Sequence, residues 1–134
     1  TEAAFLTGLS YRETADTAYL RELTAGMLDF GADAVVITGV SGKNGTIGFC
    51  GQTGDEEFFY QAPCIQSAFH GTGDMFAACF TGCWMQGKSM EEAVQIAGEF
   101  TRRSIEETYH NPAHWYGVKF EMLLPWLTDV LFEK

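Results

Sequence analysis

Basic side chains are scarce in this sequence, which has eight Lys and Arg against eighteen Asp and Glu and a formal net charge of −10. Such a balance disfavours contact with nucleic acids and anionic membrane surfaces, so we expect neither as a partner. Long apolar runs are also lacking. None reaches the roughly 18–20 residues that span a bilayer. With no visible signal peptide, a cytoplasmic location is expected.

Of two familiar site patterns, one is missing and the other lies in the wrong context. None of the four cysteines forms a Cys-x-x-Cys pair, and the Gly-x-x-x-x-Gly-Lys match at Gly82–Lys88 lies at the junction of two predicted helices instead of between a strand and a helix. Cys79 and Cys83 lie one helical turn apart, which could suit a metal, but neighbours such as Phe80 and Trp84 favour a buried core face. The context of the glycine motif therefore argues against a P-loop kinase, and the sequence gives little support to a cysteine metal site.

The hydrophobic content of 46% over 134 residues suffices for one compact domain. Apolar spacing and Gly31 predict a helix over Ser10–Phe30, and the continuous apolar run Ala34–Val40 predicts a strand buried on both faces of a parallel sheet. Further along the chain we expect two hairpin strands and three helices, over Thr46–Cys50, Glu57–Gln61, Gly73–Gln86, Ser89–Tyr109 and Phe120–Phe132. This order predicts an α/β fold, half of a doubly wound domain.

The segment His70-Gly71-Thr72-Gly73-Asp74 is the most informative stretch of the chain, and we call it the anion loop. Its glycines let the backbone approach an anion, and the helix that follows directs unpaired N–H groups and its positive end to the same point. Asp74, in the first turn, can accept a proton from a hydroxyl while the amides stabilise a transferring phosphoryl group. Phosphoryl transfer is the predicted chemistry, with an ordinary helix start capped by Thr72 or Asp74 as the alternative.

The anion loop, the Ala-rich helix after it and the upstream run Val35–Gly42 resemble the C-terminal half of ribokinase-superfamily kinases. The likeness extends over essentially the whole chain and is greatest to the vitamin B6 kinases. It implies ATP-dependent phosphorylation of pyridoxal, pyridoxine or pyridoxamine at the hydroxymethyl group. Residues 1–134 would then be the C-terminal ATP-binding and catalytic part of a ribokinase-like domain.

The beginning of the chain, Thr1–Gly8, resembles the tail of the family's Asn-x-x-Glu motif, whose acid helps to hold magnesium. The resemblance implies Glu2 as that acid and places the Asn before Thr1. We therefore expect the chain to be a fragment without the N-terminal substrate half.

The resemblance also assigns roles to the remaining site residues. Asp74 would be the catalytic base, and the amides of Gly71, Thr72 and Gly73 would stabilise the transferring group, with ATP and Mg²⁺ as cofactors. The implied nucleotide contacts are Thr38, Gly39, Gly42 and His70.

Simpler interpretations of these nucleotide contacts stay open. Strand propensity alone explains Thr38, turn chemistry explains Gly39 and Gly42, and a histidine such as His70 often serves only as a local backbone partner.

Two other functions also remain open. A sibling kinase for a hydroxymethylpyrimidine, a sugar or a nucleoside would keep the same loop, and an inactive folding unit would have no activity at all. We expect the fragment alone to be inactive and, because removing half of a sheet exposes an apolar edge, to form a homo-oligomer.

Overall fold

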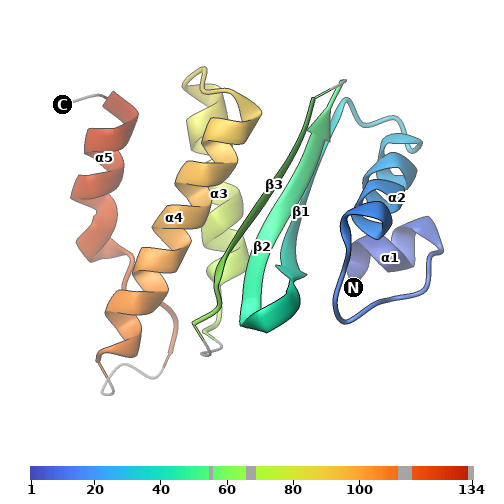
Figure 1. The fold of residues 1–134 in the computed structure, drawn as a ribbon. Coiled ribbons are helices and arrows are strands. Elements are labelled where there is room, and N and C mark those ends of the chain that lie inside the picture. The colour runs from blue at the N-terminus through green and yellow to red at the C-terminus, as the bar shows by residue number, and fades with distance from the viewer. Residues whose placement is uncertain (55, 66–68, 112–115, 133–134) are drawn as a thin grey trace. The chain divides into compact units, whose positions relative to one another are not determined.

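The first part of the chain, Thr1–Cys64, places two helices on one face of a three-stranded sheet (Figure 1). The computed structural model describes residues 1–54, 56–65, 69–111 and 116–132. Its elements in this first unit are α1 (Glu2–Thr7), α2 (Thr17–Leu28), β1 (Ala34–Ser41), a 3-10 turn (Lys43–Gly45), β2 (Thr46–Thr53) and β3 (Glu56–Pro63).

Helix α2 begins later than the apolar spacing predicted. Asp16 is its N-cap, and its carboxylate accepts a hydrogen bond from the Tyr19 N–H at 2.8 Å. The residues before this cap form a loop fixed by two bonds: the Tyr19 hydroxyl donates to the Ser10 carbonyl at 2.8 Å, and the Ala15 N–H donates to the Ser41 carbonyl at 3.3 Å. The capping carboxylate therefore sets the helix boundary.

The sheet has the order β1-β2-β3 with both pairs antiparallel, which confirms the predicted hairpin. The prediction that Ala34–Val40 lies in a parallel sheet and is buried on both faces is wrong for the described residues. There β1 pairs only with β2, and within it only Val35 and Val40 are buried. A short turn joins β1 to β2, and such a connection permits only antiparallel pairing.

The core of this first unit lies between the helices and the sheet. Tyr19, Leu20 and Leu23 of α2 pack with Val40 of β1 and Cys50 of β2. Cys50 is almost completely buried, and burial raises the pKa of its thiol to about 11. This cysteine is therefore a packing residue rather than a reactive thiol.

The described residues of the second unit, Ile65–Lys134, form helices and no strand, as predicted for this part of the chain. They are α3 (Thr72–Met85), α4 (Met90–Tyr109) and α5 (Leu124–Phe132), with a 3-10 turn (Glu121–Leu123) before α5. Figure 1 shows α4 between α3 and α5. The last helix starts after the predicted Phe120 because Pro125 is tolerated in a first turn but would break a helix interior.

Local signals at the junction of α3 and α4 act as the sequence predicts. Gly87 has a left-handed backbone (φ 84°) and ends α3, with its N–H donating to the Trp84 carbonyl at 2.9 Å. Ser89 and Glu92 form the predicted capping box: the Glu92 N–H donates to Ser89 Oγ at 3.2 Å, and the Ser89 N–H donates to Glu92 Oε2 at 2.9 Å. Each bond satisfies a backbone group that a bare helix end would leave open.

The contact between α3 and α4 is built from small side chains. Cys79 and Cys83 of α3 pack against Ala93, Ala97 and Phe100 of α4, which confirms the core interpretation of the two cysteines. Burial raises the pKa of Cys79 to about 12 and also raises that of Cys83. Neither thiol is suited to metal binding in this state.

None of the helices described here is both long and apolar enough to cross a bilayer.

An ion-pair network stabilises the middle of α4. Arg102 donates two hydrogen bonds to the Glu99 carboxylate, both at 2.9 Å, and Arg103 donates a third at 2.6 Å. The Arg103 guanidinium also lies 4.6 Å from the centre of the Trp126 ring of α5. Chiefly through the Arg102 hydrogen bonds, the pKa of Glu99 falls from 4.5 to about 2.

We predict that Glu99→Gln destabilises the protein in a pH-dependent way. Because the folded-state pKa is lowered, the Glu99 contribution is fully present above about pH 4.5 and is lost as the pH falls toward 2. Urea unfolding should show the largest difference between wild type and variant near pH 7, decreasing with acid. Glu107→Gln, which removes an exposed charge from the same helix, controls for net charge. A difference that stays constant with pH would contradict the prediction.

Candidate functional site

The anion loop leads directly into α3, and its backbone leaves several donors open. Gly71 is the N-cap, and the first hydrogen bond of the helix runs from the Met75 N–H to the Gly71 carbonyl at 2.9 Å. The N–H groups of Thr72, Gly73 and Asp74 come before that bond and have no acceptor among the described residues. Together with the positive end of a 14-residue helix, they form a candidate anion site.

A comparison with α2 and α4 shows what is special about this helix start. In those helices the N-cap side chain, Asp16 or Ser89, accepts a hydrogen bond from the N–H three residues later. The cap of α3 is a glycine, so no side chain can occupy that position. The simpler interpretation of Thr72 as a cap is not observed, because its hydroxyl donates instead to the Phe69 carbonyl at 3.5 Å.

Asp74 lies in the first turn of α3 and is exposed. Its carboxylate has no hydrogen-bond or ion-pair partner among the described residues. An exposed carboxylate next to open amides can accept a proton from a hydroxyl whose oxygen faces an anion held by those amides. The geometry thus allows the predicted base role.

His70 opens the loop and is exposed. Its ring centre lies 5.7 Å from that of Tyr116, with an angle of 33° between the ring planes. Sequence reasoning missed Tyr116 at this position, because nothing in the spacing links it to the loop.

Thr38 and Gly39 occupy an irregular point of β1. The register with β2 shifts between Thr38 and Val40, and Gly39 takes a left-handed backbone there (φ 68°). A glycine is therefore required by the bulge itself. Thr38, next to it, is exposed.

Gly42 has a structural explanation independent of any nucleotide. A Cβ at this position would clash with the side chains of Thr46 and Gln61. A larger residue between β1 and β2 would therefore require these two side chains to move.

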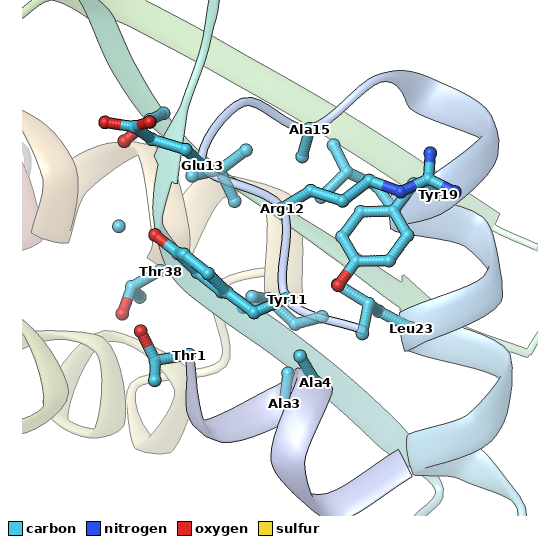
Figure 2. A pocket seen from close by; sticks show the side chains of 15 residues that line it. Thr1, Ala3, Ala4, Tyr11, Arg12, Glu13, Ala15, Tyr19, Leu23 and Thr38 are labelled. Atoms are coloured by element: carbon cyan, nitrogen blue, oxygen red, sulfur yellow. The ribbon is translucent and has the colours of Figure 1, made fainter. Parts of the chain in front are cut away.

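A small pocket lies beside Thr38 in the first unit (Figure 2). Its cavity volume is about 80 Å³, well below the roughly 300 Å³ at the lower end of small-molecule sites. In Figure 2 the hydroxyl groups of Thr1, Tyr11 and Thr38 lie on one side of it. This pocket alone is too small for a nucleotide.

Glu2 offers a single carboxylate for a metal. Its side chain is 94% exposed and lies 3.7 Å from the amino group of Thr1. Within the described ranges no three His, Cys, Asp or Glu side chains group around a possible metal position. Since Mg²⁺ in phosphate complexes uses one or two carboxylates together with phosphate oxygens and water, Glu2 fits as one ligand of such a complex and not as part of a closed cage.

The predicted site residues thus fall into two groups. The anion loop 70–74 belongs to the second unit, whereas Glu2, Thr38, Gly39 and Gly42 belong to the first.

The two loop glycines should respond differently to substitution. Gly71 has φ 83° and open space where a Cβ would be, so Gly71→Ala should lower the free energy of unfolding by about 1–2 kcal/mol through backbone strain alone. Gly73 has no positive φ, and a Cβ there would also meet open space. Gly73→Ala should therefore raise the free energy of unfolding by about 0.5 kcal/mol. Denaturant unfolding of both variants measures this, and equal effects would show that the loop backbone differs from this description.

Comparison with known proteins gives one family and a consistent set of solved structures. The family model for phosphomethylpyrimidine kinase matches residues 1–118. The solved structures include a candidate phosphomethylpyrimidine kinase from Bacteroides thetaiotaomicron, with a TM-score of 0.85, 25% identity and 97% coverage of this chain; the same protein was also crystallised with pyridoxal. No curated protein matches significantly.

Two further solved structures are pyridoxal kinases. The enzyme from Lactobacillus plantarum is 29% identical over 97% of this chain, with a TM-score of 0.78. An ADP complex of the Bacillus subtilis enzyme is 28% identical over 79% of this chain, with a TM-score of 0.68.

The chain spans less than half the length of these structures, 45% for the Bacteroides protein, 47% for the Lactobacillus enzyme and 40% for the Bacillus enzyme. The described helices and strands correspond to part of the ribokinase-like fold of pyridoxal kinases. This chain belongs to the phosphomethylpyrimidine kinase family.

Proposed function

We propose that residues 1–134 are the C-terminal, ATP-binding and catalytic part of a kinase that phosphorylates the hydroxymethyl group of a B6 vitamer. The observation that carries the proposal is the glycine-capped start of α3, which presents three open amides beside the exposed Asp74. Family membership and a solved relative with bound ADP support a nucleotide as the phosphoryl donor.

In the proposed reaction Asp74 accepts the proton of the substrate's primary hydroxyl. The hydroxyl oxygen forms a bond to the γ-phosphorus of ATP, and the bond from that phosphorus to the β–γ bridging oxygen breaks, which releases ADP. The open amides of Thr72, Gly73 and Asp74, together with that of Gly71, stabilise the charge on the transferring group, and the proton on Asp74 passes to solvent.

The remaining residues would hold the nucleotide. Thr38 and His70 offer a hydroxyl and a ring nitrogen to phosphate oxygens, and Glu2 would hold Mg²⁺. When bound, that ion would neutralise phosphate charge, which matters in a chain of net charge −10.

The vitamer is favoured as substrate over other alcohols because the relatives include two pyridoxal kinases and a protein crystallised with pyridoxal. The family description favours a second candidate, a hydroxymethylpyrimidine. A panel of pyridoxal, pyridoxine, pyridoxamine and hydroxymethylpyrimidine, assayed with a kinase that carries this chain and a substrate-binding part, distinguishes the two. Phosphorylation of the pyrimidine alone would overturn the vitamer proposal.

Asp74→Asn in such a kinase should lower kcat by about two to four orders of magnitude and leave Mg-ATP affinity nearly unchanged, because only proton removal is lost. Glu91→Gln is the matched control. It removes a carboxylate from the first turn of α4, likewise exposed, and should leave kcat as in wild type. Coupled measurement of ADP release gives both values, and near-normal turnover of the Asp74 variant would exclude it as the base.

We further propose that the chain by itself self-associates and lacks kinase activity. The edge of β1 away from β2 has no partner strand in the described part of the chain, and open apolar edges pair readily with other chains. Light scattering over a range of concentrations should give a mass above the 14.8 kDa of one chain. A constant mass of one chain would contradict self-association, and pyridoxal phosphorylation by the same sample would contradict the need for a further part.

A further inference from the structure

Tyr116, which follows α4 in the chain, lies beside the start of α3. Its ring lies 5.7 Å from the His70 ring at the entrance of the anion loop. Both side chains are exposed, so neither residue is held there by burial in a core. The position of Tyr116 must therefore be fixed through neighbouring residues.

Thr108, near the end of α4, supplies the attachment. Its side chain is almost fully buried, and its hydroxyl donates to the Ser104 carbonyl at 2.6 Å. The same oxygen accepts a hydrogen bond from the Lys119 N–H at 2.8 Å, eleven residues further along the chain. A buried hydroxyl on an apolar helix face is costly unless it is bonded, and this one uses both its donor and an acceptor position.

The short path from Lys119 back to Tyr116 is also fixed. Val118 is buried, and Gly117 takes a left-handed backbone (φ 71°) that turns the chain between the two anchored points. Tyr116 is therefore tied to α4, which packs on α3 through the buried core of this unit. The whole path lies within residues that the structure describes.

The anion loop itself has little internal support. Gly71 can adopt many backbone conformations. Among the described loop residues, the side-chain hydrogen bond from Thr72 to the Phe69 carbonyl is long at 3.5 Å. A loop of this kind binds phosphate well only when other groups hold its amides in place beforehand.

We propose that Thr108 and Tyr116 together position His70, and with it the amides of the anion loop, for phosphate binding. Thr108 fixes the chain that carries Tyr116, and the Tyr116 ring contacts His70; we call this pair the brace. Tyr116 is then a positioning residue for the proposed nucleotide site, on which this inference rests. Aromatic ring contacts of this kind are weak, so the brace tunes affinity without creating it.

The experiment uses the 134-residue chain and two matched pairs of variants, Tyr116→Leu with Tyr116→Phe and Thr108→Val with Thr108→Ser. Proton NMR of the His70 ring without nucleotide reports the contact directly, because the Tyr116 ring shifts those resonances. Titration with Mg-ATP, followed by amide resonances, gives the affinity. The denaturation midpoint of each variant shows whether the fold is intact.

The Tyr116→Leu variant should lose the ring-induced shift of His70 and bind Mg-ATP about two- to ten-fold more weakly, with an unchanged midpoint. Tyr116→Phe and Thr108→Ser should keep the ring-induced shift of His70 and the wild-type affinity for Mg-ATP. Thr108→Val should lose the shift and bind Mg-ATP more weakly. Should the valine variant unfold, the Tyr116 pair still tests the contact with His70 and its effect on Mg-ATP affinity.

An unchanged His70 signal in Tyr116→Leu would overturn the contact, and an unchanged Mg-ATP affinity would overturn its role in binding. Failure of the proposed function is recognised separately, because wild type itself would then show no response to Mg-ATP, and the binding role of the brace would fall with it.

Discussion

A helix commonly satisfies one of its first N–H groups with a side chain at the N-cap, and in α3 a glycine prevents this. Gly71 has no side-chain oxygen to offer, and its positive φ turns the chain so that the helix starts without one. In α2 and α4, Asp16 and Ser89 each accept a hydrogen bond from the third N–H of the helix, the position that Asp74 occupies in α3. The open amides, the exposed Asp74 and the proposed phosphate site all depend on this difference.

Local signals allowed much of the fold to be predicted from the sequence. The box of Ser89 and Glu92 and the stop at Gly87 define the junction between α3 and α4, because they act within a few residues. The errors lie where a second signal competed. Apolar spacing extended the first long helix back to Ser10, although Asp16 caps it, and began the last helix at Phe120, although Pro125 fits only in a first turn.

Strand pairing was harder to predict because it depends on what lies beside each strand. The apolar run of β1 favours a strand between parallel neighbours, yet the turn after Ser41 joins it to β2 in antiparallel order. The candidate site likewise has features that the sequence predicts and contacts that it does not. Glycine spacing predicts the anion loop, whereas the contact of His70 with Tyr116 and the bond from Lys119 to Thr108 join distant residues that no sequence period connects.

Chemical-shift mapping of the 134-residue chain with Mg-ATP tests the central claim most directly, because it reports each backbone amide and detects weak binding. If the glycine-capped start of α3 is the phosphate site, the largest changes will fall on the amides of Thr72, Gly73 and Asp74, and the N-termini of α2 and α4 will stay unaffected. Changes confined to other residues, or none at saturating nucleotide, would contradict the account.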